Sequence, residues 1–258
     1  MEVPADVDGS QPTGQPYDGL LLDHDGVIVT LGDESALGDA ARNALRDAGV
    51  DDPDPAVVET LRIWVSESDL TDVSRRYDLD PDRLWRYRDD HVRDELLAQV
   101  RDGGKRPYDD VAVLGDVNRP VGVVSNNQTR IVETVLEYYD LSHHVETIRA
   151  RAPRRESLGR KKPRPTFLEE AMADLGLENP LYVGDSESDV EAGKRAGVDV
   201  AYIRRDHNTE VTLKCDPAYE VTGLDEVLDV FRDGHIDEQV GSGPSECADA
   251  TATPDSDR

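Results

Sequence analysis

A run of three leucines, Leu20–Leu22, leads directly into Asp23, His24, Asp25 and Gly26. A short apolar run of this kind is typical of a buried strand in a parallel sheet, and such strands deliver their last residues to the carboxyl edge, where open α/β folds bind ligands. Because Asp23 and Asp25 are two positions apart in an extended segment, both side chains can point to one face, while His24 points to the other and is expected to pack. Gly26 lets the chain turn away without a side chain in the way. The segment therefore predicts an acidic site at a sheet edge.

Short apolar runs alternate with helical patterns along most of the chain. The runs lie at 19–23, 121–125, 181–185 and 200–203, with weaker candidates at 145–148 and 219–221, and apolar residues at helical spacing lie at 130–139, 166–175, 190–196 and 224–231. This alternation predicts an α/β fold, a doubly wound parallel sheet with helices on both faces.

Three further motifs follow the first in order. Ser125-Asn126-Asn127 ends the second apolar run, Lys161-Lys162-Pro163 comes later, and Gly184-Asp185-Ser186-Glu187-Ser188-Asp189 ends the third run. Together they supply a hydroxyl at one strand end, a cation, and two more acids at another strand end.

This ordered set resembles the four motifs of the haloacid dehalogenase-like (HAD) hydrolase superfamily, which are Asp-x-Asp, Ser/Thr, Lys and Gly-Asp-x-x-x-Asp. The resemblance covers about residues 17–231 and implies a Rossmann-like core formed by 17–34 and 108–233. The gap between the first motif and Ser125 is far longer than one crossover helix requires, and the resemblance makes residues 35–107 a mostly helical cap domain with helices at 36–48, 55–68 and 81–100. Residues 1–16 and 234–258 are rich in polar and turn-forming residues, and we expect them to be disordered ends.

The resemblance also implies a reaction. The chain would be a phosphatase that hydrolyses a small phosphorylated metabolite, phosphoglycolate-like or sugar-phosphate-like, through an aspartyl-phosphate. Asp23 would be the nucleophile and Asp25 the general acid and base. A Mg²⁺ ion held by Asp23, the main-chain carbonyl of Asp25 and Asp185 would offset the repulsion between carboxylate and phosphate, with Asp189 in support.

The phosphoryl group needs donors and a fixed cation, because its oxygens carry negative charge. The resemblance assigns the cation to Lys162 and the donors to Ser125 and the backbone amides of Asn126 and Gly26. Lys161 is a competing candidate, but Lys162 directly precedes Pro163 and fits the Lys-Pro-x-Pro pattern of the family better.

Other activities of the superfamily stay open at this point. A sugar-phosphate mutase is one alternative, and a non-catalytic member that binds a phosphorylated ligand or a protein partner is another. Asp25 speaks against a dehalogenase, which needs no proton donor there. A phosphonatase would bring a lysine from the cap, and Lys105, at its far margin, is the only lysine between Leu31 and Asp110.

Two groups of residues have both a functional and a structural interpretation. Aromatic and basic residues of the cap either contact the substrate or form the cap core; they are Arg62, Trp64, Trp85, Arg86, Tyr87 and Arg88. Between Arg149 and Arg164 lie eight basic residues and a single acid, Glu156. This stretch is either a positive rim that attracts phosphorylated substrates or a loop whose charges pair with acids elsewhere.

The charge of the chain limits its partners. It has 56 acidic and 29 basic residues and a formal net charge of -27, so we expect no binding to nucleic acid or to anionic membranes. No apolar run is long enough to span a bilayer and the N-terminus does not resemble a secretion signal, so a cytoplasmic location is expected. The sequence leaves the oligomeric state open.

The acid excess also predicts how stability responds to salt. It resembles that of cytosolic proteins from salt-loving microbes, in which salt screens the repulsion among dense carboxylates. We expect the melting temperature to rise as KCl is increased into the molar range, as measured by calorimetry or circular dichroism. A melting temperature that falls with added salt would argue against salt adaptation.

Overall fold

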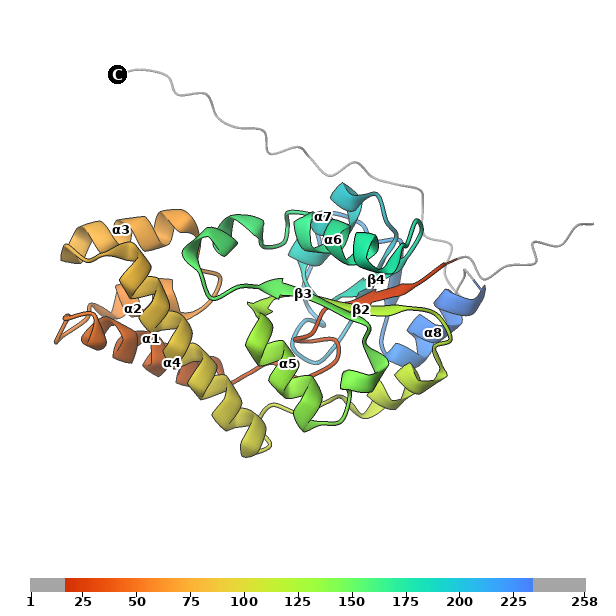
Figure 1. Cartoon of the computed structure of the whole chain (residues 1–258), viewed down its shortest axis with the longest axis horizontal. Helices are drawn as coiled ribbons and strands as arrows, with labels where there is room; N and C mark the ends of the chain where they lie inside the picture. Colours follow the sequence, from red (N-terminus) through yellow and green to blue (C-terminus); the bar gives the residue numbers. More distant parts are fainter. Residues whose placement is uncertain (1–16, 234–258) are drawn as a thin grey trace, which may run out of the picture.

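The computed structural model describes residues 17–233, and its centre is a six-stranded sheet (Figure 1). The strands are β1 (Leu20–Leu22), β2 (Val121–Gln128), β3 (Thr147–Arg151), β4 (Leu181–Gly184), β5 (Val200–Ile203) and β6 (Tyr219–Val221). They lie in the order β3-β2-β1-β4-β5-β6, and every neighbouring pair is parallel. The predicted α/β fold with a doubly wound parallel sheet is confirmed. The third strand begins two residues later than the pattern predicted.

Helices cover both faces of the sheet because its strands are apolar on both sides. Leu20 and Leu22 pack on one face with α5 (Thr129–Tyr138) and α8 (Leu224–Asp233), whereas Leu21 packs on the other with α6 (Thr166–Leu175) and α7 (Glu187–Ala196). All three leucines are fully buried. The 3₁₀ segments η1 (Asp109–Asp116), η2 (Ser142–His144) and η3 (Arg155–Arg160) complete the connections.

Four helices lie between β1 and β2 and form a separate lobe, on the left in Figure 1. They are α1 (Glu34–Asp47), α2 (Pro55–Arg62), α3 (Glu67–Tyr77) and α4 (Pro81–Arg101), and we call them the helical insertion. Their facing sides form a core of their own, which Leu158 of η3 joins. The α4 helix also packs against α5 and connects the insertion to the sheet. The division of the chain into domains at 34 and 108 stays a prediction.

The insertion has four helices where the sequence analysis predicted three, because α3 was not predicted. The predicted helix 55–68 ends at Arg62, and a new helix begins at Glu67. Trp64 has a φ of 57°, which a helix does not accept, and Ser66 and Asp69 form a reciprocal capping box that starts α3. The pattern Ser-x-x-Asp at 66–69 was a visible signal for this boundary.

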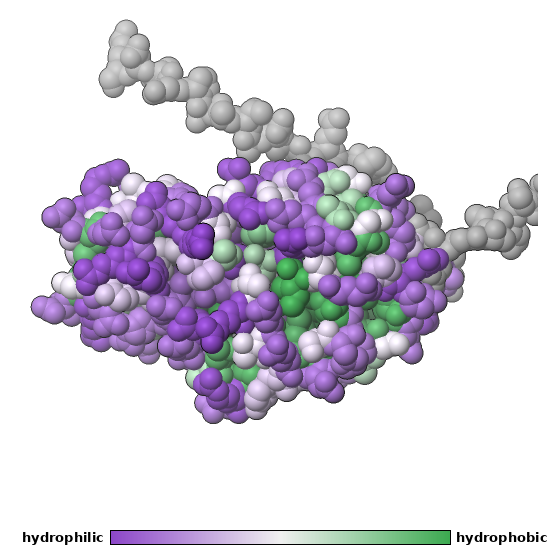
Figure 2. All heavy atoms as spheres, viewed as in Figure 1, coloured by the Kyte–Doolittle hydropathy of each residue, from purple (hydrophilic) through white to green (hydrophobic). Residues whose placement is uncertain are grey.

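Part of the acid excess has a structural use at helix starts. Asp33, Asp54 and Asp80 are N-caps whose side chains accept hydrogen bonds from the first-turn amides of α1, α2 and α4. An oxygen at this position satisfies a donor that the helix leaves unpaired. The surface view is predominantly hydrophilic over the helical insertion, and hydrophobic residues appear mainly over the sheet (Figure 2). Within 17–233, no helix has the length and apolarity that a membrane crossing needs. The predicted disordered ends, 1–16 and 234–258, lie outside the described residues.

The central strand yields a stability prediction. Leu21 is fully buried between the sheet and α6 and α7, so Leu21→Ala leaves a cavity and should lower the free energy of unfolding by about 2–5 kcal/mol, measured by urea titration. Tyr138→Ala, at a side chain 55% exposed on α5, is the control and should cost much less. Equal losses from the two variants would contradict this account of the core.

Candidate active site

The carboxyl ends of β1, β2 and β4 bring the motif residues together. These strands are neighbours in the sheet, so Asp23 after β1, Ser125 in β2 and Asp185 after β4 meet at one edge. They line a cavity of about 530 Å³ together with Asp25, Asn126 and Lys162. All three strand-end side chains are buried, with Asp23 8% and Ser125 1% exposed. Residues separated by more than a hundred positions therefore share one cavity.

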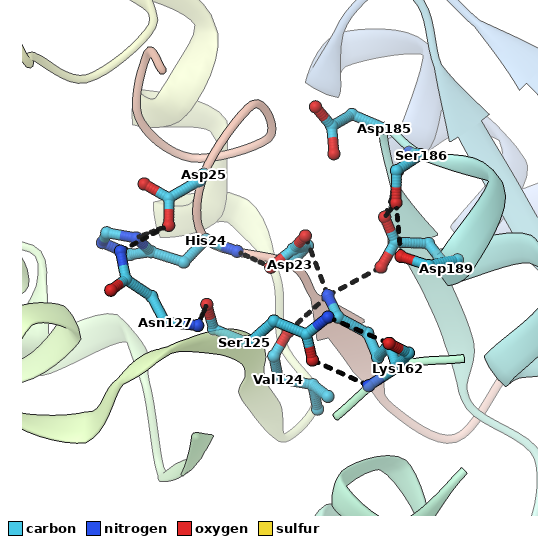
Figure 3. Close-up of polar contacts among 12 residues, drawn as sticks. Asp23, His24, Asp25, Val124, Ser125, Asn127, Lys162, Asp185, Ser186 and Asp189 are labelled. Atoms are coloured by element: carbon cyan, nitrogen blue, oxygen red, sulfur yellow. Dashed lines mark hydrogen bonds and ion pairs between the residues drawn. The ribbon is translucent and has the colours of Figure 1, made fainter. Parts of the chain in front are cut away.

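Lys162 lies at the centre of the polar contacts in this cavity (Figure 3). Its Nζ lies 2.8 Å from Asp23 Oδ2 and 2.6 Å from Asp189 Oδ1, and it also donates to the carbonyl of Val124 and the hydroxyl of Tyr182. Burial alone would lower the pKa of Lys162, but the carboxylates of Asp189 and Asp23 outweigh it and raise the pKa. Lys162 is therefore a permanently charged cation beside Asp23.

The backbone of Lys162 is fixed by Asn126. The Asn126 side chain accepts a hydrogen bond from the Lys162 amide at 2.7 Å and donates to the Lys162 carbonyl at 3.1 Å. A two-point contact of this kind sets both position and orientation. Lys161, the competing candidate for the phosphate-site cation, instead donates to the carbonyl of Val65 in the helical insertion.

Asp189 lies behind Lys162 and has no exposed surface. Its Oδ1 accepts from Lys162 and from Tyr182 Oη at 2.6 Å, and its Oδ2 accepts from the amide and hydroxyl of Ser186. Burial alone would raise the pKa of Asp189, but Lys162 lowers it below the ordinary value. Asp189 thus combines the role of a helix N-terminal acid in the capping box of α7 with that of a fixed partner for Lys162.

Asp23 and Asp185 have fewer compensating contacts. The His24 amide donates to Asp23 Oδ1 at 2.6 Å, and His207 Nε2 donates to Asp185 Oδ2 at 2.7 Å. Burial raises the pKa of Asp23 well above its ordinary value; Lys162 opposes the rise and neighbouring carboxylates increase it. Burial also raises the pKa of Asp185, although the contact with His207 opposes this. A further cation beside Asp23 and Asp185 would stabilise the ionised form of both carboxylates.

The donor set fits a hard divalent metal. Oxygens of Asp23, Asp185 and Asp189 lie within 4.8 Å of one another, and Mg²⁺ prefers carboxylate oxygens. The oxygens of Asp189 already accept four hydrogen bonds, so Asp23 and Asp185 are the better ligand candidates. The predicted ligand set of Asp23, Asp185 and the Asp25 carbonyl, with Asp189 in support, stays a prediction.

Gly26 differs in part from its predicted role. A side chain there would put Cβ 1.8 Å from Asp185 Oδ2, and Gly26 has a φ of 81°. Glycine is therefore required both for the turn and for the approach of Asp185. Its amide, predicted to bind phosphate, donates to the carbonyl of Val29 at 2.7 Å and is already used.

Asp25 is held by residues to which the sequence analysis gave no part in the site. Lys105 Nζ forms an ion pair with its Oδ1, and Asn127 Nδ2 donates to its Oδ2 at 2.9 Å. His24 is fully buried as expected, but its Nδ1 also lies 3.3 Å from Asp25 Oδ2. Burial alone would raise the pKa of Asp25, but Lys105 and His24 hold it well below its ordinary value.

Of the residues that the sequence analysis did not assign to the site, some could have been found from the sequence and others could not. Asn127 belongs to the Ser125 motif, and Lys105 stood out as an isolated lysine in a long acidic segment. His207 and Asn208, which donates to the carbonyl of Asp185 at 2.8 Å, follow β5 in a loop without a motif. No sequence pattern indicated that this loop returns to Asp185.

The basic stretch 149–164 is largely paired with acids. Arg149 contacts Asp174, Arg151 contacts Asp89, Arg155 contacts Glu67, and Arg160 contacts Glu170. Three of its members, Arg151, Lys161 and Lys162, line the cavity.

Some of the aromatic and basic residues of the insertion line the cavity, and others pair with residues outside it. Trp64, Trp85 and Arg88 line the cavity, whereas Arg62 pairs with Glu34 and Glu59, and Tyr87 contacts Arg83.

Comparison with known proteins agrees with this fold and motif set. The profile of haloacid dehalogenase-like hydrolases matches residues 90–203. The phosphoglycolate phosphatase of Aquifex aeolicus is 32% identical over 102 residues, which cover 37% of this chain and 46% of that enzyme, so the match spans about half of the relative's length. The fructose-1-phosphate phosphatase YqaB of Escherichia coli is 29% identical over 196 residues, which cover 73% of this chain and 97% of YqaB.

A solved structure has the same fold over most of the chain. A predicted phosphoglycolate phosphatase from Haemophilus somnus superposes with a TM-score of 0.60 at 19% identity, covering 83% of this chain and 98% of that protein. At this identity the likeness shows the fold alone. The ordered motifs, the profile matched over residues 90–203 and the shared fold all make the chain similar to the haloacid dehalogenase-like hydrolases.

Proposed function

We propose that the protein is a Mg²⁺-dependent phosphatase that hydrolyses a small phosphorylated metabolite through an aspartyl-phosphate. The observation that carries the proposal is the placement of Asp23 in a cavity, 2.8 Å from the buried cation Lys162, with Asp25 and Ser125 in the same cavity wall. The named relatives that act on phosphoglycolate and fructose 1-phosphate support this substrate class.

Asp23 is the proposed nucleophile. A carboxylate oxygen attacks phosphorus, and the bond from phosphorus to the leaving oxygen breaks, so that the phosphoryl group is bound to Asp23. Water then attacks phosphorus, the bond to the Asp23 oxygen breaks, and phosphate is released. Lys162 supports both steps, because its charge offsets that of the phosphoryl oxygens. Mg²⁺, held by Asp23 and Asp185 with the Asp25 carbonyl, would supply further positive charge to the same oxygens. Ser125 and the Asn126 amide are the proposed donors to them.

Asp25 is the proposed general acid and base. It gives a proton to the leaving oxygen in the first step and takes one from the attacking water in the second. The ion pair with Lys105 favours the carboxylate, which is the form that the second step needs. Donation in the first step requires Asp25 to carry a proton while the contact with Lys105 is weakened. We infer that Lys105 and Asn127 act by orienting this carboxylate toward the cavity.

Metal dependence and the nucleophile can be tested together. Hydrolysis of p-nitrophenyl phosphate in molar KCl should require Mg²⁺, stop on addition of EDTA, return when Mg²⁺ is restored, and be absent in Asp23→Asn. Asp229→Asn, at an exposed position of α8, removes the same charge and should retain activity. Hydrolysis that ignores EDTA or survives Asp23→Asn would remove the mechanism. Complete inactivity of the wild-type chain toward phosphorylated metabolites would favour a non-catalytic member.

Asp25→Asn separates proton transfer from binding. Its carbonyl ligand and an acceptor for Lys105 remain, but the proton relay is lost, so kcat should fall by about 10²–10⁴-fold while inorganic phosphate still binds in the presence of Mg²⁺. Calorimetric titration with phosphate measures the binding. A thermal melt serves as the control, because Lys105 becomes a buried charge without a charged partner. Loss of phosphate binding in a folded variant would contradict this division of roles.

A further inference from the structure

A second group of basic residues lines the cavity apart from Lys162. It consists of Arg88 of α4, Arg151 at the end of β3, and Lys161, together with Trp85 of α4. We call these four residues the cationic wall. The guanidinium carbons of Arg88 and Arg151 lie 5.4 and 4.8 Å from the centre of the Trp85 ring, so the arginines and the indole form one cluster.

The cationic wall has more positive charge than its partners neutralise. Asp89 pairs with Arg151 through two hydrogen bonds of 2.6 and 2.8 Å, and it lies 3.6 Å from Arg88. The other contacts are neutral carbonyls: Arg88 donates to those of Leu61 and Arg62, Arg151 to that of Ala152, and Lys161 to that of Val65. Three cations thus share one close carboxylate in a chain of net charge -27, so composition does not explain the surplus.

Burial makes this surplus costly. Burial, together with the positive charges of Arg151 and Arg88, lowers the pKa of Lys161 to about 8. Burial also lowers the pKa of Arg88 to about 10, with Asp89 opposing and Arg151 adding to the shift. Buried charges are normally paired, because an unpaired one loses its hydration without a replacement. An anion in the cavity would supply the missing charge.

The cationic wall also has donors to offer. The Trp85 indole nitrogen is buried and has no acceptor among residues 17–233, although a buried N–H is normally hydrogen-bonded. Lys161 carries three N–H groups, and its described hydrogen bond uses one of them. An oxygen anion accepts from both kinds of donor.

We propose that the cationic wall binds a second anionic group of the substrate, a carboxylate or a second phosphate, while the phosphoryl group lies at Asp23. This inference rests on the proposed phosphatase function and narrows its substrate to small phosphomonoesters that carry another negative charge. A cavity of about 530 Å³ is large enough to hold both groups of such a molecule. A neutral leaving group would leave the surplus charge and the Trp85 donor without partners.

The test compares substrates of nearly equal shape. 2-Phosphoglycolate carries a carboxylate, ethylene glycol bisphosphate carries a second phosphate, and 2-hydroxyethyl phosphate carries a neutral hydroxyl. We expect kcat/KM for at least one anionic substrate to exceed that of the neutral one by about tenfold or more, and to fall toward it in Lys161→Met, mainly through KM. The anionic substrate with the larger preference identifies the second group.

Two variants control for fold and for charge. Lys161→Arg keeps a cation and should keep most of the preference, whereas Lys194→Met, in the last turn of α7 and outside the cavity lining, should not change it. Equal kcat/KM for charged and neutral substrates, or a preference that survives Lys161→Met, would overturn the inference. Hydrolysis of p-nitrophenyl phosphate distinguishes this result from failure of the proposed function. Calorimetry on Asp23→Asn gives the same comparison as binding affinities if turnover is absent.

The preference should also depend on pH in a defined direction. Lys161 loses its proton as the pH rises through about 8, so the advantage of an anionic over the neutral substrate should shrink between pH 7 and 9. The charged groups around Lys161 are Arg151, Arg88, Asp89 and Asp69, and arginines and ionised carboxylates keep their charge over this range. Lys161→Arg should abolish the pH effect, because a guanidinium stays protonated. A preference that is constant from pH 7 to 9 in the wild-type protein would exclude Lys161 as the responsible cation.

Discussion

The buried ion pairs of Lys162 are the interaction on which the site depends. Its ammonium lies between Asp23, which follows β1, and Asp189, which is in the first turn of α7, the helix after the neighbouring strand β4. Removing the charge of Lys162 would leave two buried carboxylates without their shared cation, which is costly in a low-dielectric interior. The same contacts set the distance between the proposed nucleophile, Asp23, and the cation proposed to assist it. The ion pairs therefore serve two purposes: they neutralise buried charge, and they hold Asp23 beside Lys162.

The fold was predictable from the sequence because its strands are short, apolar and bounded by turn residues. In a parallel sheet the carboxyl ends meet at one edge, so locating β1, β2 and β4 also located Asp23, Ser125 and Asp185. The break between α2 and α3 was not predicted, since apolar spacing continues through Trp64, and only the left-handed backbone and the capping box reveal it. Helical periodicity records which residues face the core but not where the chain turns.

The residues that contact the acids of the candidate site were harder to predict for a different reason. His207 reaches Asp185, and Lys105 reaches Asp25, from loops whose course depends on tertiary packing. No local periodicity fixes that course, and a lone histidine or lysine in a polar loop is usually at the surface. The two possible roles of the basic stretch could not be separated for the same reason. Some residues of this stretch, such as Arg149, pair with acids at the surface, whereas others, such as Lys161, line the cavity.

Lys105 connects the helical insertion to the proposed general acid. It lies four positions after Arg101, the last residue of α4, and the segments that enter and leave the insertion are joined by hydrogen bonds between Thr30 and Arg106. Lys105 Nζ donates to the carbonyl of Thr30 and pairs with Asp25, and the residue is absent from the cavity lining. A phosphonatase needs a lysine amine that faces its substrate, whereas this amine is used within the protein. Because the ion pair spans the base of the insertion, a displacement of α4 would change the surroundings of Asp25 directly. The position of the insertion and the proton affinity of Asp25 are therefore physically linked.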